Sequence, residues 1–215
     1  MSSSIRERYR AQVRDEAKQA ALAQLAQGGP GALSISAVGK QLGVSGPALY
    51  RYFASRDELL TELVIDAYDD LAGALADAAG EDRRGRFETV ARAYRAWALA
   101  QPHRYRLLFG PPLPGYDAHA ERIVDAAWAS MKVLLDVIGQ VGDGTGDDGL
   151  PQPLASQLAA WTWPYPAARP GTALRAVLAW SRLHGIVSLE IAGNFASMGL
   201  DAEQLFEVQL ATLTA

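Results

Sequence analysis

The stretch LSISAVGKQLGVSGPALYRYFASRDEL, residues 33–59, decides the fold of this 215-residue chain. Ser34 stands directly before an apolar run, where its hydroxyl is suited to cap the N-terminus of a helix. Gly43 supplies the small residue that a sharp turn requires after that helix. Ser45 is placed in the same way to cap a second short helix. The spacing therefore predicts a helix, a tight turn and another helix.

Longer amphipathic helices are expected on both sides of this stretch. Before it, small and apolar residues recur with helical spacing across residues 6–27, and GGPG at 28–31 ends the pattern. After it, Ser55 and Glu58 have the spacing of a capping box. The apolar spacing that follows predicts a helix that continues to residue 79.

The rest of the chain has the same helical periodicity, and no segment alternates polar and apolar residues for long enough to predict a strand. Residues 142–170 hold many of the Gly and Pro residues and predict a long loop with one short helix. The sequence therefore predicts an all-α protein of about nine helices. The further helices are expected at residues 87–101, 103–109, 118–141, 172–195 and 201–213.

The composition is that of a compact protein with a sizeable core, since 49% of the residues are hydrophobic and 20% are charged. The chain has no Cys, which excludes disulfides, thiol nucleophiles and thiolate metal sites. Its three His residues lack metal-binding spacing, so we expect neither a metal nor another cofactor. No apolar run approaches the roughly 20 residues that cross a bilayer, and the N-terminus lacks a signal-peptide pattern. We therefore expect a cytoplasmic protein with no membrane partner.

The charge is divided unevenly along the chain. The net charge is −4, but residues 1–60 carry +3 and the remainder carries −7. A basic segment on an acidic protein is compatible with a nucleic-acid partner, because the charge that matters is the charge at the contact surface. This segment is therefore the candidate for contact with DNA.

Residues 33–59 resemble the DNA-binding head of the TetR family of transcriptional regulators. The family pattern is a Ser or Thr cap, an apolar residue followed by a small one, Gly-Val-Ser, and a short helix that ends in Leu-Tyr-x-His/Tyr-Phe before a basic residue. This sequence departs from the pattern at Gly39, where Ala is usual, and at Pro47 and Ala48, where Gly-Thr is frequent. The matching residues are Ser34, Val38, Gly43, Val44, Ser45, Leu49, Tyr50, Tyr52, Phe53 and Arg56.

The resemblance implies a helix-turn-helix DNA-binding domain at residues 1–56 and a ligand-binding and dimerisation domain at residues 57–215. In a helix-turn-helix the second helix enters the major groove by its N-terminus, where N–H groups and short side chains approach phosphates and base edges. The expected DNA-binding residues are Ser34, Ser45, Gly46, Pro47, Ala48, Tyr50, Tyr52 and Arg56.

Several of these side chains have an alternative, purely structural role. Tyr50 and Tyr52 are expected to reach phosphate oxygens, since other residues supply the buried face, but they also suit half-buried core positions. Ser34 and Ser45 are helix caps that we expect to touch phosphate as well. Four N-terminal arginines form either an arm along the DNA backbone or a solvated helix face: Arg6, Arg8, Arg10 and Arg14.

The body of the chain resembles a TetR subclass with a Trp-x-x-x-His-Gly signature, in residues 93–110 and 179–195. Trp180, His184 and Gly185 form the signature. The resemblance implies a small-molecule effector bound between the helices, which aromatic walls would make hydrophobic, and a homodimer formed through the last two helices. The expected ligand-pocket residues are Tyr94, Trp97, Tyr105, Phe109, Trp128, Trp180 and His184. From the residues alone, this set also suits a plain core, and His184 suits either a core hydrogen bond or a cavity.

We therefore expect a homodimeric, sequence-specific transcriptional regulator, a repressor that a small hydrophobic ligand releases from a palindromic operator in double-stranded DNA. No catalytic function is expected. GTGDDG at 144–149 fits a dinucleotide-binding pattern but follows no strand, and GVSGP at 43–47 falls one residue short of a nucleophile elbow. Two alternatives remain: a ligand-binding helical dimer without specific DNA recognition, and a small-molecule enzyme that uses His184 and Glu190 for acid–base chemistry.

Overall fold

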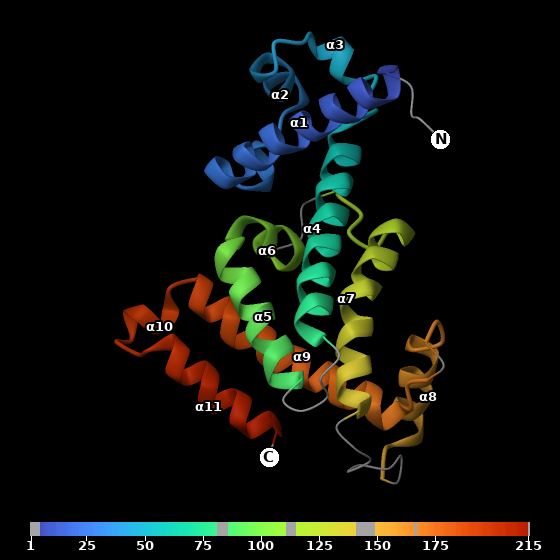
Figure 1. The fold of residues 1–215 in the computed structure, drawn as a ribbon, viewed down its shortest axis with the longest axis vertical. Coiled ribbons are helices and arrows are strands. Elements are labelled where there is room, and N and C mark those ends of the chain that lie inside the picture. The colour runs from blue at the N-terminus through green and yellow to red at the C-terminus, as the bar shows by residue number, and fades with distance from the viewer. Residues whose placement is uncertain (1–4, 81–85, 111–114, 141–148, 166, 215) are drawn as a thin grey trace. The chain divides into compact units, whose positions relative to one another are not determined.

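The computed structural model of the protein describes residues 5–80, 86–110, 115–140, 149–165 and 167–214. These residues form eleven α-helices and one 3-10 helix, and no strand is present among them (Figure 1). Nine of the described α-helices have seven or more residues. The prediction of an all-α protein of about nine helices is confirmed. None of the described helices is both long and apolar enough to cross a membrane.

The chain divides into two compact units. Unit 1 comprises Met1–Tyr68 and His103–Asp125. Unit 2 comprises Asp69–Pro102 and Ala126–Ala215. Each unit therefore contains segments that are far apart in the sequence.

Two long helices are divided between the units. Helix α4 (Arg56–Ala79) and helix α7 (Glu121–Gln140) each begin in unit 1 and end in unit 2. The predicted division of the chain between residues 56 and 57 falls at the N-terminus of α4 and stays a prediction.

Unit 1 contains the predicted helix, turn and helix. Gly43 has φ +68°, in the left-handed region that favours glycine, and makes the sharp turn that its position predicts. The second helix is short, and the chain after Leu49 continues as a turn in which the Tyr52 and Phe53 amides donate to the Leu49 carbonyl at 2.9 and 3.1 Å. The elements of unit 1 other than α4 and α7 are α1 (Ile5–Gly28), η1 (Pro30–Ala32), α2 (Ile35–Gln41), α3 (Gly46–Leu49) and α6 (Pro102–Phe109).

The core of unit 1 lies behind α3. Leu49 and Phe53, which the sequence predicts as a buried pair, are fully buried. They pack in one cluster with Val38 of α2, with Leu59 of α4 and with the apolar side of α1. Because this cluster occupies the inner side of α3, the outer side of the helix is left for solvent or a partner.

The capping box predicted at the start of α4 is present, but one of its two hydrogen bonds involves a different amide. The Ser55 hydroxyl accepts a hydrogen bond from the Glu58 amide at 3.0 Å, as predicted. The Glu58 carboxylate, however, accepts from the amide of Ala54 instead of that of Ser55. The helix therefore begins where the sequence indicates, and the carboxylate satisfies the amide that lies one residue earlier.

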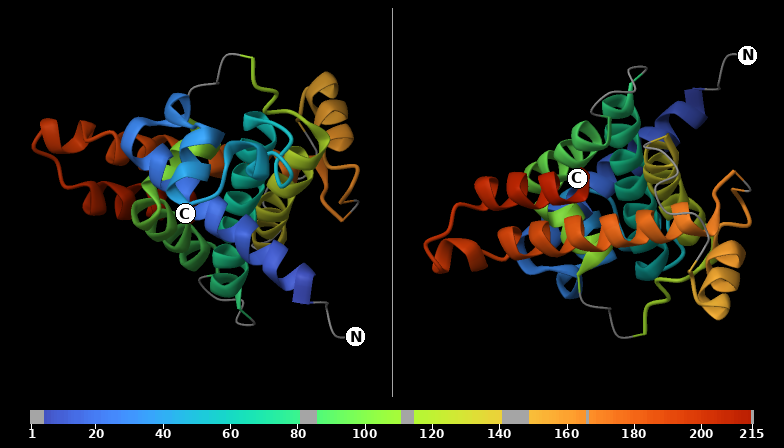
Figure 2. Two further views of the ribbon diagram at one scale, coloured as in Figure 1. Left: turned by 90° about the horizontal axis from the view of Figure 1, so that it is seen from above. Right: turned by 90° about the horizontal axis from the view of Figure 1, so that it is seen from below.

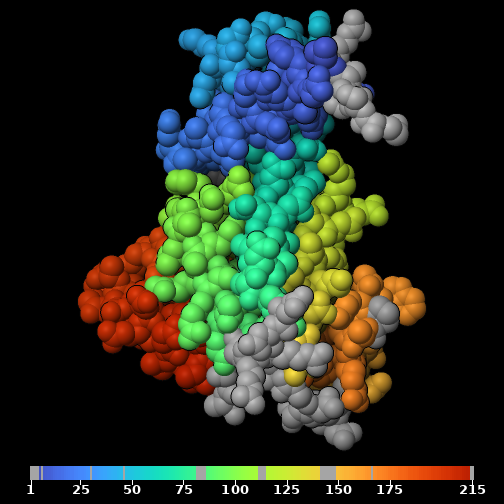
Figure 3. All heavy atoms as spheres, viewed as in Figure 1, coloured from blue at the N-terminus to red at the C-terminus, as the bar shows by residue number. Residues whose placement is uncertain are grey.

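Helix α9 is central to unit 2. It contacts α5, α8, α10 and α11, and α11 also contacts α5. Figure 2 (right) shows α11 beside α9 and α8 near the N-terminal end of α9, and Figure 3 shows the red C-terminal part of the chain next to α5 in green. The elements of unit 2 other than α4 and α7 are α5 (Arg86–Ala100), α8 (Gln152–Trp161), α9 (Pro170–Ile191), α10 (Asn194–Ser197) and α11 (Ala202–Thr214).

Two sequence predictions about unit 2 have clear outcomes. The helix predicted at 172–195 ends earlier, at Ile191, because Gly193 adopts φ +77° and a separate turn of helix, α10, begins after it. The loop predicted at 142–170 carries α8 as its one short helix among the described residues. Residues 141–148, which include most of the GTGDDG pattern, lie outside the described residues.

Candidate nucleic-acid interface

The helix-turn-helix places short side chains at the tip of α3. The Ser34 hydroxyl caps α2 by accepting a hydrogen bond from the Ala37 amide at 3.4 Å, as predicted. The Ser45 carbonyl accepts from the amides of Ala48 and Leu49 at 2.9 and 3.2 Å. Ser45 and Pro47 are exposed, and Ala48 is half-buried. A helix tip with short exposed side chains allows a close approach to a groove edge.

The two tyrosines after α3 have different surroundings. Tyr50 is 50% exposed. Tyr52 is half-buried and packs against the core of unit 1, and the Arg10 guanidinium lies 5.9 Å from the centre of its ring. The exposure of Tyr50 suits a phosphate contact, whereas Tyr52 combines a packed ring with a place next to an arginine.

Arg56 at the first position of α4 is oriented by its own unit. Its Nε donates to the Leu33 carbonyl at 3.1 Å, and its Nη1 pairs with Asp57 at 3.2 Å. These contacts hold the guanidinium between the start of α4 and the chain that enters α2. A cation held at this place is suited to a phosphate that approaches both helix N-termini.

The N-terminal arginines do not behave as one group. Arg8 and Arg10 are exposed, and the side chain of Arg6 lies outside the described residues. Arg14 is instead engaged within unit 1, where it donates to the Tyr52 carbonyl at 2.6 Å and pairs with Glu62 at 3.1 Å. The sequence predicts either an arm along the DNA or a solvated helix face for these arginines. Both predictions are wrong for Arg14, because the partly buried carboxylate of Glu62 binds it.

An open hollow next to α3 includes one residue that the sequence analysis missed. The hollow has a volume of about 560 Å³. Tyr9 of α1 is 63% exposed and lies in it, beside two guanidinium groups. The sequence feature that could have identified Tyr9 is a large aromatic side chain outside the apolar spacing of α1. The hollow is lined by Ile5, Tyr9, Arg10, Ala48, Arg51 and Tyr52.

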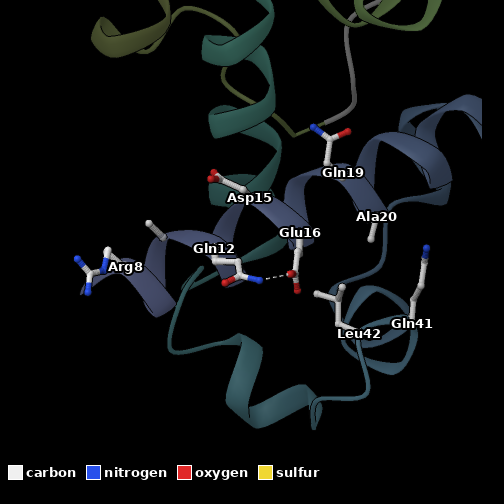
Figure 4. Close-up of a pocket in the computed structure, with 9 residues that line it drawn as sticks. Arg8, Gln12, Asp15, Glu16, Gln19, Ala20, Gln41 and Leu42 are labelled. Carbon is white, nitrogen blue, oxygen red and sulfur yellow. Dashed lines mark hydrogen bonds between the residues drawn. The ribbon is translucent and has the colours of Figure 1, made fainter. Parts of the chain in front are cut away.

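A second groove, between α1 and α2, has a different character (Figure 4). Gln12 donates to Glu16 at 2.9 Å within it, and Asp15 and Arg8 also contribute to its wall. Two carboxylates and one guanidinium make this surface unfavourable for phosphate. The basic hollow beside α3 is therefore the better candidate for contact with DNA.

The predicted ligand-pocket residues are distributed over both units. Tyr105 and Phe109 belong to unit 1, where their ring centres lie 5.1 Å apart. The other five belong to unit 2. In unit 2 Tyr94 and Trp97 are buried on α5, and the Trp97 indole N–H donates to Asp70 at 2.8 Å. The residues of this set stay a prediction.

Two stacked pairs account for the remaining predicted pocket residues. Trp128 stacks on Trp161 with ring centres 5.3 Å apart, and Trp180 stacks on His184 at 5.6 Å. Burial lowers the pKa of His184 below its ordinary value. A separate cavity of about 220 Å³ in unit 2 is lined by Phe87, Ile138, Arg175, Leu178, Ala179, Arg182, Thr212 and Leu213.

Comparison with known proteins identifies the family. Residues 19–63 match the family described as "Bacterial regulatory proteins, tetR family". Residues 87–213, more than half of the chain, match "Tetracyclin repressor-like, C-terminal domain". The chain belongs to the TetR family. This confirms the resemblance of residues 33–59 to the TetR family, and the subclass with the Trp-x-x-x-His-Gly signature stays a prediction.

Relatives of this TetR-family protein carry regulatory names. The HTH-type transcriptional regulators Rv1816 of Mycobacterium tuberculosis and Mb1846 of Mycobacterium bovis are each 36% identical over 205 residues, which cover 89% of this chain and 86% of theirs. The solved structure of the regulatory protein SCO4313 is 43% identical, with a TM-score of 0.80 over 98% of both chains. FadR of Bacillus halodurans, a fatty acid degradation regulator, shares the fold at 14% identity and a TM-score of 0.65, over 94% of this chain and 97% of its own.

The protein is therefore a transcriptional regulator of the helix-turn-helix type. Members of the TetR family bind DNA operators, form dimers and carry a C-terminal ligand-binding domain. In this TetR-family regulator the matched regions correspond to the two segments on which the sequence analysis depends: the head around α2 and α3, and the helices from α5 to α11.

Ion pairs connect the last helices of this TetR-family regulator to α5. Arg95 donates through two nitrogens to Glu190 of α9, at 2.8 and 2.7 Å, and its guanidinium lies 5.3 Å from the ring centre of Phe206. Arg92 pairs in the same bidentate way with Glu207 of α11, at 2.9 and 2.7 Å. This hydrogen-bonded pairing lowers the pKa of Glu207. The pairs hold α9 and α11 in position against α5.

Proposed function

We propose that this protein is a homodimeric repressor that reads a palindromic operator with α3 and leaves it when a small hydrophobic ligand binds its body. In this proposal residues 1–56 read the DNA, and residues 57–215 bind the ligand and form the dimer. One observation carries the proposal: the short, exposed side chains at the tip of α3 stand directly before Leu49 and Phe53, which are fully buried.

The proposed DNA contacts divide into two kinds. Ser45, Ala48 and the backbone from Gly46 meet base edges and the groove, since they are small and lie at a helix N-terminus. Tyr50, Tyr52, Arg56 and Ser34 then meet phosphates and position the head. Few long polar side chains remain for direct base readout, so DNA shape contributes to the choice of sequence. Pro47 completes the contact surface.

The proposed dimer uses the outer faces of α9 and α11. Leu178 and Leu189 of α9 and Val208 of α11 are large apolar side chains that are exposed in the single chain. Exposed apolar surface of this kind is typical of a protein–protein interface. A two-fold axis through these helices places two heads on half-sites about one turn of DNA, roughly 10 base pairs, apart.

The proposed ligand site uses the aromatic residues of the body, with Tyr94, Trp97, Trp128, Trp180 and His184 from unit 2. Tyr105 and Phe109 of α6 complete the proposed set. Aromatic walls favour an apolar ligand, with His184 as a polar group. Helices α4 and α7 run through both units, so a ligand that displaces either helix changes operator affinity through a coupling of about 1–3 kcal/mol.

We propose that the protein has no catalytic role. The alternative in which His184 and Glu190 perform acid–base chemistry is disfavoured, because both oxygens of Glu190 accept hydrogen bonds from Arg95. A carboxylate held in a bidentate ion pair is a poor proton acceptor.

The test of this proposal is selection from a pool of random duplexes at two or more salt concentrations. The full-length protein is expected to enrich a palindrome with half-sites about one helical turn apart. A control variant, Ala48→Glu, introduces a carboxylate at the tip of α3 and is expected to abolish enrichment while the circular dichroism spectrum stays helical. If the unmodified protein retains DNA without any sequence preference and loses it at moderate salt, the operator-reading proposal is wrong.

A further inference from the structure

Two arginines from different helices bind one carboxylate in unit 1. Glu62 of α4 pairs with Arg14 of α1 at 3.1 Å and with Arg122 of α7 at 2.8 Å. The Glu62 side chain is only 18% exposed. Burial by itself raises the pKa of this carboxyl, but the two arginines outweigh burial, and the net result is a lowered pKa. Glu62 is therefore a charged junction between three helices.

Arg14 also contacts the turn that follows α3. Its Nη1 donates to the Tyr52 carbonyl at 2.6 Å, and its guanidinium lies 4.6 Å from the ring centre of Phe53. Both residues lie in the turn that directly follows α3, whose amides donate back to Leu49. One planar guanidinium thus joins the turn after α3 to a carboxylate on α4, and an arginine fork is suited to this because its donors have fixed directions.

We propose that Arg14 and Glu62 form a positioning pair for the DNA interface. In this role the pair holds the turn at residues 50–53 so that α3 presents its tip at a defined angle to α4, and Arg122 links the pair to the start of α7. The expected effect of this pair on DNA affinity rests on the proposed operator reading, whereas its expected effect on the turn does not. Arg14 uses its donors within unit 1 and is a positioning residue, whereas Arg8 and Arg10 on the same helix are exposed and Arg10 donates to the Arg51 carbonyl at 3.4 Å.

The same two helices provide a matched control. Lys18 and Asp66 lie one helical turn beyond Arg14 and Glu62 and form a pair of 2.8 Å between α1 and α4. This pair also crosses from α1 to α4, and Lys18 has Asp15 as its second partner at 3.9 Å. Removing the Lys18–Asp66 pair shows how much any ion pair between α1 and α4 contributes, while the hydrogen bond from Arg14 to Tyr52 is kept.

The first experiment measures amide hydrogen exchange in the free full-length protein. Arg14→Gln is expected to raise exchange of the Tyr52 and Phe53 amides about tenfold, because the turn loses a charge-assisted hydrogen bond. Glu62→Gln is expected to have a similar effect, because Arg14 loses the carboxylate that orients its donor toward the Tyr52 carbonyl. Asp66→Asn is expected to change it less than about twofold. An equal change in Asp66→Asn and Glu62→Gln, or no change in either, would overturn the proposed positioning of the turn.

The second experiment measures affinity for the duplex enriched from the random pool, as a function of salt. Glu62→Gln and Arg14→Gln are expected to lower affinity about tenfold without changing the salt slope, and Arg14→Lys to restore part of the loss. A slope that falls by about one unit per head in Arg14→Gln would make Arg14 a phosphate ligand and overturn the proposal. If Glu62→Gln fails to fold, Arg14→Lys against Arg14→Gln decides the question.

The two experiments separate the two proposals. If no duplex is enriched, operator reading fails, and the exchange of the Tyr52 and Phe53 amides still decides whether the pair holds the turn. If a duplex is enriched and neither variant weakens it, the positioning role fails while operator reading stands. A double-variant cycle of Arg14→Gln and Glu62→Gln is expected to show less than additive loss, because each change breaks the same pair.

Discussion

Arg95 of α5 and Glu190 of α9 face each other as a bidentate pair, with both guanidinium–carboxylate distances below 3 Å and both side chains mostly buried. The two residues are 95 positions apart in the sequence. Their contact holds α9 against α5.

Replacing Glu190 by Gln is expected to lower the free energy of unfolding by about 2 kcal/mol, because a mostly buried guanidinium loses its counter-charge. Glu207→Gln is the matched control, since Glu207 binds Arg92 in the same geometry at an exposed position. Its effect on the free energy of unfolding should be small. Urea unfolding followed by circular dichroism measures both variants, and equal effects would contradict the role assigned to burial.

The stability of the protein is expected to depend on His184 at mildly acidic pH. Burial lowers the pKa of His184 in the folded state below the ordinary value of 6.5, so the unfolded chain binds the proton first as the pH falls. This group's contribution to stability is therefore complete above about pH 6.5 and decreases as the pH falls towards the lowered pKa. Unfolding free energies at several pH values between about 5 and 7.5 should show a smaller decrease in His184→Asn than in the unmodified protein. Parallel curves for the two proteins would exclude this histidine as the cause.

Arg56→Ala should weaken binding to every duplex by a similar factor and reduce the salt slope by about one unit per head, because a phosphate contact releases one counterion. Tyr50→Phe is the companion change, which removes a neutral hydroxyl and should weaken binding without altering the slope. Fluorescence anisotropy over a range of salt concentrations measures both. An unchanged salt slope in Arg56→Ala would mean that Arg56 does not contact phosphate. Its role would then be the structural hydrogen bond to the Leu33 carbonyl.

Val208→Glu is expected to shift the protein from dimer to monomer, since it places a charge on an apolar face of α11 that is 66% exposed in the single chain. Val124→Glu on α7 is the control, because Val124 is also exposed but lies outside α9 and α11. Light scattering after size-exclusion chromatography gives the mass of each variant. If both variants keep the dimer mass, the interface lies elsewhere.

The sequence by itself determined the helices and the head, because the signals that specify them are local. A cap at Ser34, a left-handed glycine at Gly43 and the spacing of Leu49 and Phe53 each act over a few residues, and all were found where predicted. Local signals also explain the error at the end of α9. Apolar periodicity continues past Gly193, whereas the backbone of that residue ends the helix.

Only the tertiary structure decided which charged groups meet. Arg14 carries the same basic side chain as Arg8 and Arg10, and the sequence offers no sign that a carboxylate on α4 binds it, because Arg14 and Glu62 meet through packing of separate helices. The division of the aromatic residues between the two units has the same origin. Helical periodicity tells which side of a helix is buried, but the partner on that side depends on the packing of elements distant in the chain.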